Sequence, residues 1–125
     1  MTKQEKLQMY LSFLKEEGIN IVNYNSDMVV FEFEKNMYLI EIKNSDTFFA
    51  LVSNIPIESI KKENINKIYF YATRMNTIKL NDCDRGFLVA SETFISEPIN
   101  FKGIFYMAIS AVNAALDIIY EKGNE

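Results

Sequence analysis

The 125-residue chain has no histidine and no tryptophan, one cysteine, two prolines and four glycines. The lack of histidine excludes Ser/His/Asp and Cys/His catalytic arrangements and removes the commonest protein ligand for metal ions. One cysteine cannot form an intrachain disulfide, which is typical of proteins in a reducing compartment. The scarcity of glycine and proline, together with 49% hydrophobic residues, predicts a compact folded chain rather than a disordered one.

Length and the N-terminal residues indicate one domain in the cytoplasm. A chain of 125 residues matches the usual size of a domain and can bury a core. It contains no internal repeat or linker, so residues 1–125 are expected to fold as a single domain. Residues 1–6 form no apolar signal segment, and no uninterrupted apolar run is long enough to span a bilayer. We therefore expect a cytoplasmic protein.

The net charge of −4 is spread unevenly along the chain. The negative net charge argues against general binding to nucleic acid or to anionic membranes. However, residues 58–79 carry +3 and the rest of the chain carries −7. Within this basic window, Lys67, Tyr71 and Arg74 would share one helix face and could contact phosphate or stack on a base. The other explanation is a solvated helix face, because no RNA-binding strand motif accompanies these residues.

The first element is predicted to be a helix. Thr2 and Glu5 have the spacing of a capping box, and Gly18 suits the position that ends a helix in a left-handed conformation. An apolar stripe between them recurs at helical spacing and consists of Leu7, Tyr10, Leu11 and Leu14.

Two alternating segments, 28–34 and 37–43, predict a β-hairpin with Lys35 and Asn36 as its two-residue turn. The third strand is expected over 47–53, and residues 19–24 either extend the first strand or lead into it. In this register the core face would pair Phe33 with Tyr38, Phe31 with Ile40, and Val29 with Ile42. The opposite face would carry Met28, Val30, Met37 and Leu39 beside the carboxylates of Glu32, Glu34 and Glu41.

The second half of the chain is predicted to contain a helix, a strand pair and a final helix. Short strands are expected over 76–80 and 86–95, and the last helix begins near Ser96 or Asn100, either of which could be its cap. The element order is therefore α-β-β-β-α-β-β-α, an α+β fold with three helices and a mainly antiparallel sheet of about five strands. The middle helix is expected from the helical spacing of Ile65, Ile68, Tyr69, Ala72 and Met75.

The last helix is unusually apolar, since 15 of the 20 residues from Phe101 to Tyr120 are hydrophobic. A helix of this kind is normally buried on more than one side. A membrane anchor is disfavoured because Asn113 and Asp117 would be costly in lipid. The polar residues form one narrow stripe of Lys102, Ser110, Asn113 and Asp117.

The stretch LNDCDRG at residues 80–86 contains the only cysteine. It offers Asp82, Cys83 and Asp84 as metal ligands, but a structural zinc site needs a second pair of ligands that the chain lacks. A calcium loop would require a glutamate where Thr93 stands, and the two flanking carboxylates disfavour a reactive thiolate. The composition is that of a hairpin turn, so we expect no catalytic residue, no metal and no cofactor at this site.

Two features of the predicted sheet could still have a function. Carboxylates at Glu32, Glu34 and Glu41 could perform acid–base chemistry in a pocket, although a solvated face is the simpler explanation.

The apolar surface is the stronger signal, because a single small domain has limited core in which to hide both the outer sheet face and the last helix. Surplus apolar surface marks protein interfaces, and methionine suits adaptable recognition. Either helices cover both surfaces, or the outer sheet face is open to a partner. In the second case the partner-binding face is formed by Met28, Val30, Met37 and Leu39.

The order of elements resembles that of the type III secretion chaperone-like fold, and in particular its bacterial sensory-regulator-like branch. The segment SDMVVFEFEKNMYLIEIK resembles the first hairpin of that branch. The segment ATRMNTIKLNDCDRGFLVASETFI resembles its helix end, strand, acidic turn and following strand, which ends near Glu92 here. The resemblance covers nearly the whole chain and includes no catalytic motif.

This resemblance implies a small, acidic, non-enzymatic and commonly homodimeric protein. Secretion chaperones bind an extended segment of a partner protein on their sheet and helix surfaces, so an unidentified protein partner is expected, held by apolar side chains and strand addition. The basic middle helix departs from the usual pattern of the group. The resemblance places the dimer interface on that helix, at Ile65, Ile68, Tyr69, Ala72 and Met75.

Overall fold

The computed structural model describes residues 1–125 and contains three helices and six strands. The helices are α1 (Lys3–Glu16), α2 (Ile65–Ala72) and α3 (Phe101–Gly123). The strands are β1 (Asn20–Tyr24), β2 (Met28–Phe33), β3 (Asn36–Glu41), β4 (Phe48–Pro56), β5 (Ile78–Cys83) and β6 (Gly86–Phe94). They form a single antiparallel sheet in the order β1-β2-β3-β4-β6-β5, which confirms the α+β class and the three predicted helices.

The sheet has one strand more than expected, because residues 20–24 pair with β2 as a separate edge strand. The side chain of Asn25 causes the separation. Its Oδ1 accepts hydrogen bonds from the backbone N–H groups of Asp27 and Met28 at 2.7 and 3.0 Å. This local turn reverses the chain between the two strands, so β1 cannot simply extend β2.

The first hairpin forms as predicted, but its turn lies one residue earlier. Glu34 and Lys35 occupy the turn with φ values of 49° and 70°, so Phe31 pairs with Tyr38 and not with Ile40. The register therefore moves by two residues. Because side chains alternate with a period of two, the core face keeps the predicted residues.

The second hairpin places most of residues 80–86 in strands. β5 continues to Cys83, and the turn itself consists of Asp84 and Arg85 before β6 begins at Gly86. The middle helix is shorter than predicted and ends at Ala72.

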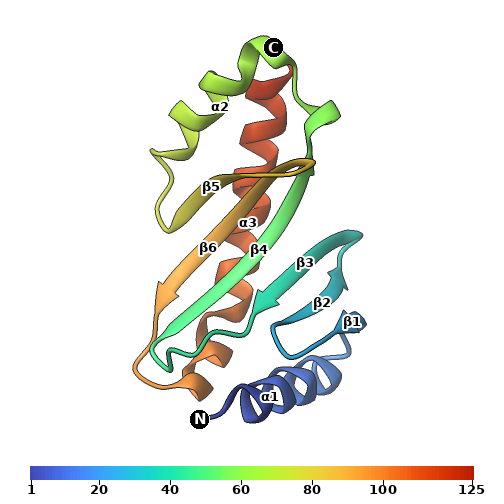
Figure 1. The fold of residues 1–125 in the computed structure, drawn as a ribbon, viewed down its shortest axis with the longest axis vertical. Helices are drawn as coiled ribbons and strands as arrows, with labels where there is room; N and C mark the ends of the chain where they lie inside the picture. Colours follow the sequence, from blue (N-terminus) through green and yellow to red (C-terminus); the bar gives the residue numbers. More distant parts are fainter.

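All three helices cover the same face of the sheet. On that face, the ring of Phe31 lies 5.6 Å from Phe105 of α3, and Tyr10 of α1 lies 6.2 Å from Phe49. Figure 1 shows α3 running behind β4 and β6, α1 beneath the β1–β3 end, and α2 beside the C-terminal end of α3. The sheet is thus one layer with helices on one side and no helix on the other.

Helix α3 begins after a 3₁₀ turn at Pro98–Asn100, and the side chains of Ser96 and Asn100 do not cap its first turn. Asn100 instead donates a hydrogen bond to Ser96. By length and hydropathy alone α3 could cross a membrane. Its most buried side chains, however, pack against the sheet and α1, and they include Phe101, Phe105, Val112, Ala115 and Ile119.

Helix α1 holds the loop between β3 and β4 through a buried lysine. The predicted capping box of Thr2 and Glu5 is present. One turn later, the ammonium of Lys6 donates to the carbonyl oxygens of Lys43 and Ser45 at 2.7 and 2.9 Å. The same Nζ lies 2.9 Å from Oδ1 of Asp46. The loop that connects β3 to β4 is therefore fixed to α1.

Candidate binding groove

The junction between β3 and β4 is paired over a short distance only. Its ladder has two residue pairs, Leu39 with Val52 and Ile40 with Leu51. Beyond these pairs the two strands diverge, and Figure 1 shows β3 turning away from β4 with α3 passing behind. In contrast, β4 pairs with β6 along its whole length.

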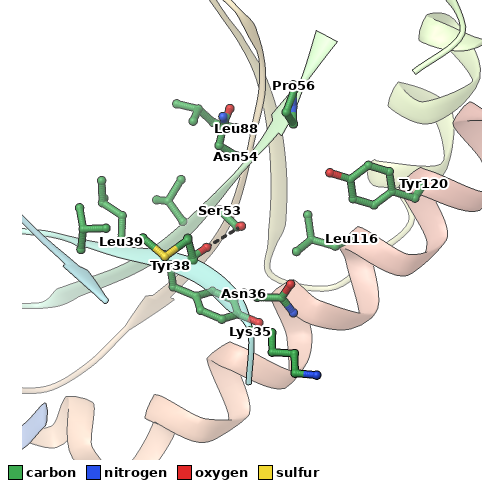
Figure 2. A pocket seen from close by; sticks show the side chains of 13 residues that line it. Lys35, Asn36, Tyr38, Leu39, Ser53, Asn54, Pro56, Leu88, Leu116 and Tyr120 are labelled. Carbon is green, nitrogen blue, oxygen red and sulfur yellow. Dashed lines mark hydrogen bonds between the residues drawn. The ribbon is translucent and has the colours of Figure 1, made fainter. Parts of the chain in front are cut away.

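A groove with a volume of about 410 Å³ occupies the space between the diverging strands. Its walls come from β3 and β4, and Leu116 and Tyr120 of α3 reach into it from behind (Figure 2). Eight of its thirteen lining residues are hydrophobic. The size and the apolar lining are typical of a binding site rather than of a packing defect. The hydrophobic lining includes Val30, Met37, Tyr38, Leu39, Val52, Leu88, Leu116 and Tyr120.

A side chain takes the place of the missing ladder at the narrow end of the groove. Ser53 donates a hydrogen bond from Oγ to the carbonyl oxygen of Met37 at 3.0 Å (Figure 2). At the other end, Asn36 donates a long bond of 3.4 Å to Asn113 of α3. These two contacts tie β3 to β4 and to α3 without closing the space between them.

Backbone groups of both strands face the groove. Residues in an antiparallel strand direct their N–H and C=O groups alternately to the two neighbouring strands. Since Leu39 and Val52 pair with each other, the same alternation directs the backbone of Met37 and Asn54 into the groove. The ladder is not continued past Leu39 and Val52 beside the apolar floor, and the carbonyl oxygen of Met37 accepts the Ser53 hydroxyl there instead.

Three of the four residues predicted to bind a partner line the groove. Val30, Met37 and Leu39 do so, while Met28 lies on the same outer sheet face beyond the groove. Sequence reasoning missed Val52, Leu88, Leu116 and Tyr120. Leu116 and Tyr120 are one turn apart on α3, a spacing that the sequence shows, but nothing in the pattern indicates that two strands part in front of them.

An apolar row crosses the outer face of the sheet beside the groove. Val30, Leu39, Val52 and Ala90 stand directly opposite one another on four adjacent strands. Glutamates lie in the neighbouring rows. Two of them are paired with lysines, Glu41 with Lys43 at 3.1 Å and Glu92 with Lys79 at 3.7 Å.

Carboxylates lie near the groove, although the only charged residue that lines it is Lys35. Glu32 stands opposite Met37 on the outer face, and Glu34 belongs to the adjoining turn. Burial raises the pKa of Tyr38, and the nearby carboxylates of Glu34 and Asp117 raise it further, while a hydrogen bond with Asn36 lowers it.

The residues predicted to form a dimer interface have different exposures. Ile68 and Ala72 are buried within the chain's own core, so they have no surface to offer a second copy. Ile65, Tyr69 and Met75 are half-buried. Burial and a hydrogen bond to Asp82 raise the pKa of Tyr69 to about 12.

The basic face predicted on α2 is partly occupied by intramolecular contacts. Lys67 forms an ion pair with Glu125. The guanidinium of Arg74 lies 4.2 Å from the centre of the Phe70 ring. The ammonium of Lys122 lies 4.9 Å from the ring of Tyr71. Of the three predicted residues, Lys67 and Tyr71 lie on α2, whereas Arg74 lies in the turn that follows it, and the ion pair with Glu125 reduces the positive charge of this region.

The acidic hairpin around Cys83 lies beside β4. Cys83 is half-buried, and its Sγ lies 3.8 Å from Oδ1 of Asn54. The chain has no group of three or more Cys, Asp or Glu side chains placed to hold a metal ion.

Comparison with known proteins gives matches in structure alone. No family model matches the chain, and neither does any curated protein sequence. YbjN from E. coli, a proposed transcription regulator, has a TM-score of 0.59 at 8% identity, covering 94% of this chain and 90% of that protein. The Yersinia pestis type III secretion chaperone SycH, solved with a fragment of YscM2, has a TM-score of 0.55 at 12% identity, with coverage of 88% and 98%.

The chain has the type III secretion chaperone-like fold. A third match, from the heterodimeric ExoU–SpcU complex of Pseudomonas aeruginosa, agrees with a TM-score of 0.52 at 9% identity, covering 90% of this chain and 96% of that one. The resemblance expected from the sequence is thus confirmed at the level of the fold, including its likeness to a protein outside the secretion chaperones. At these identities the comparisons establish the architecture and not the role.

Proposed function

We propose that this protein is a non-catalytic, cytoplasmic protein-binding module that holds a segment of another protein in the groove between β3 and β4. The observation that supports the proposal is the groove itself: an apolar space of about 410 Å³ on the face that no helix covers. An open apolar surface of this kind is typical of a recognition site. Two proteins of the same fold were solved with partners, a YscM2 fragment and ExoU.

The test compares partner capture by variants that differ only in where a charge is introduced. Replacing Met37 and Leu39 together with aspartate places two carboxylates at the groove wall. The control variant replaces Ile57 and Met107 with aspartate; these side chains are 52% and 71% exposed and lie outside the groove. Thermal unfolding of each variant would establish that all of them fold.

We expect affinity capture from the native host's lysate to recover a stoichiometric protein with the wild-type chain and with the control. The Met37/Leu39 variant should lose that protein. Equal recovery by all three chains would contradict the assignment of the groove.

The protein is further proposed to be a homodimer that uses the exposed parts of Ile65, Tyr69 and Met75. Light-scattering mass of the purified chain tests this directly. Replacing Met75 with aspartate should convert a dimer to a monomer, whereas a monomeric wild-type chain would rule out the dimer.

Nucleic acid is the less supported alternative. Lys67, the one cation of α2, is paired with Glu125, and Arg74 in the following turn is stacked on Phe70. Salt-sensitive retardation of single-stranded oligonucleotides, lost on replacing Lys67 and Arg74 with alanine, would be required to favour it.

A further inference from the structure

A second cavity, with a volume of about 290 Å³, lies between α3 and the strands β5 and β6. It is on the helix-covered face of the sheet, in a stretch that the other two helices leave open: α2 lies beside the C-terminal end of α3, and α1 lies at the β1–β3 end (Figure 1). Met107 of α3, which lines the cavity, is accordingly 71% exposed. The cavity shares no lining residue with the groove between β3 and β4, so its use is independent of the proposed function.

The strand wall of this cavity is polar at positions where a hydrophobic core is expected. Alternate residues of β6 face the helices, and the first two of them, Phe87 and Val89, are buried apolar side chains. The next two are Ser91 and Thr93, and Ser91 is only 2% exposed. Burying a hydroxyl costs free energy unless it is hydrogen-bonded, and an apolar side chain at the same position would avoid that cost. The change from apolar to hydroxyl side chains therefore indicates a requirement other than packing.

The hydrogen-bond partner of Ser91 is Thr77, which is held in a strained conformation. The two hydroxyl oxygens lie 3.2 Å apart. The φ angle of Thr77 is 63°, which is an outlier for a β-branched residue. Backbone strain of this kind is found preferentially at functional sites. Since the hydrogen bond uses one of the two hydroxyl protons, the pair can still donate one hydrogen bond and accept others.

The opposite wall is apolar, and no charged residue lines the cavity. The α3 side is formed by Ile104, Ala108 and Ala111, with Met107 at its exposed edge. A charged ligand would lose its hydration here without gaining an opposite charge. The volume exceeds the roughly 150 Å³ of an engineered apolar cavity that holds benzene, so one ring with a short substituent fits.

We propose that this cavity binds a small uncharged alcohol or phenol, whose hydrocarbon part has the size of one ring. The hydrocarbon part lies against Ile104, Ala108 and Ala111. The hydroxyl of the ligand joins those of Ser91 and Thr77, donating a hydrogen bond to one of them and accepting one from the other. A ligand without the hydroxyl leaves the free donor of the pair without a partner, and a carboxylate in its place meets no cation.

The test compares three compounds that share one ring: benzyl alcohol, toluene and benzoate. Each is titrated at millimolar concentrations into the isotope-labelled full chain, and the backbone amide shifts are followed by NMR. We expect benzyl alcohol to shift the amides of residues 76–77, 91–93 and 104–111. Toluene should bind about two- to tenfold more weakly, because it lacks one hydrogen bond, and benzoate should leave these amides unshifted.

Two variants remove the hydroxyl pair. Ser91→Ala should weaken benzyl alcohol by about two- to tenfold and leave toluene unchanged. The matched control, Ser110→Ala at an exposed position of α3 outside the cavity, should change neither. Thr77→Gly should weaken benzyl alcohol to the same extent and raise the thermal unfolding midpoint, because glycine adopts a positive φ without strain.

A third variant fills the cavity from the helix. Ala111→Leu places a larger side chain against the strand wall and should abolish binding of both benzyl alcohol and toluene. Ala114→Leu makes the same change at an exposed position of α3 that does not line the cavity, and it should bind both compounds as the wild type does.

Three results would overturn the site: no amide shifts with benzyl alcohol, equal binding of the three compounds, or binding of benzyl alcohol that survives Ala111→Leu. If Ala111→Leu does not fold, Ser91→Ala decides instead, because an unchanged affinity for benzyl alcohol would contradict the role of the hydroxyl pair. Partner capture should be equal for the wild type and Ser91→Ala, since Ser91 lies outside the groove. Failure of the proposed function therefore leaves this site standing, and failure of this site leaves the groove standing.

Discussion

Strand β4 has two neighbours, and the two junctions differ in how they are closed. Against β6 the backbone pairs continuously from Phe48 with Phe94 to Pro56 with Gly86. Against β3 the ladder stops after two residue pairs, and the hydroxyl of Ser53 provides the next contact. The same strand therefore contributes to a sealed junction on one side and to a groove on the other, which shows that the groove depends on where β3 is held.

The neighbours of each strand account for this difference. β3 is paired along its length to β2 through a tight turn at Glu34 and Lys35, so it follows the first hairpin. The distal half of β4 follows β6, and Pro56 at its end has no backbone N–H to offer β3. The two halves of the sheet thus separate in front of α3, which packs beneath both.

The largest effect is expected at the sealed junction, from Gly86→Ala. A Cβ atom at this position would lie 2.0 Å from the carbonyl oxygen of Ile55 and 2.9 Å from the backbone nitrogen of Ile57. Because both obstructing atoms belong to the backbone, β4 and the β5–β6 hairpin must move apart. We expect the free energy of unfolding to fall by about 3 kcal/mol in urea titrations.

Gly103→Ala on α3 is the matched control for this substitution. Its Cβ would have no neighbour within 4 Å, and alanine favours a helix interior over glycine. The control should therefore raise stability by about 1 kcal/mol. A Gly86→Ala protein as stable as the wild type would show that the junction is looser than the structure indicates.

An intermediate effect is expected where α1 holds the loop between the two strands. Lys6→Met keeps the buried stem but leaves the carbonyl oxygens of Lys43 and Ser45 without their donor. We expect a loss of about 2 kcal/mol in the free energy of unfolding at neutral pH.

The same variant has a signature in acid. The ion pair with Lys6 and the hydrogen bond from the N-terminal ammonium hold the pKa of the Asp46 carboxyl below its ordinary value of 3.8. A carboxyl whose pKa is lower in the folded than in the unfolded state stabilises the protein at pH values above its unfolded-state pKa. That stability is lost as the pH falls through its folded-state pKa. The wild type should therefore lose stability below about pH 4, and Lys6→Met should lose less of it. Parallel pH profiles of the two proteins would contradict this role of Lys6.

The smallest effect is expected at the open junction, from Ser53→Ala. The substitution removes the hydroxyl that bridges to Met37, and the neighbouring ladder is already short. Stability should fall by about 1 kcal/mol, and the amides of Leu39 and Val52 should exchange hydrogen faster. Ser110→Ala, at an exposed position on α3, should leave that exchange unchanged. Unaltered exchange in Ser53→Ala would mean that the hydroxyl does not hold the strands together.

Periodicity in the sequence predicts most of the architecture. The alternation of residues 28–34 and the helical spacing from Ile65 to Ala72 identify a strand and a helix that the structure contains. The register of the first hairpin was wrong by two residues, because asparagine was expected at a position of positive φ and Glu34 and Lys35 occupy those positions instead. The core face survived the error because the shift was even.

The groove could be predicted in part. Alternation placed Val30, Met37 and Leu39 on the outer face, which is where the structure has them. The contribution of Leu116 and Tyr120 was not predicted, since the positions at which two strands separate depend on long-range packing and not on local pattern. For the same reason Ile68 and Ala72 looked available on their helix although α3 and β5 bury them.

The floor of the groove comes from helix α3, and this affects how the groove can change as homologous sequences diverge. Leu116 and Tyr120 take part in no strand ladder, so exchanging them alters the depth and shape of the groove while the sheet's hydrogen bonds stay intact. Under the proposed function, a duplicated gene would acquire a new binding preference through two codons of one helix, within the limits that packing sets on the buried Leu116.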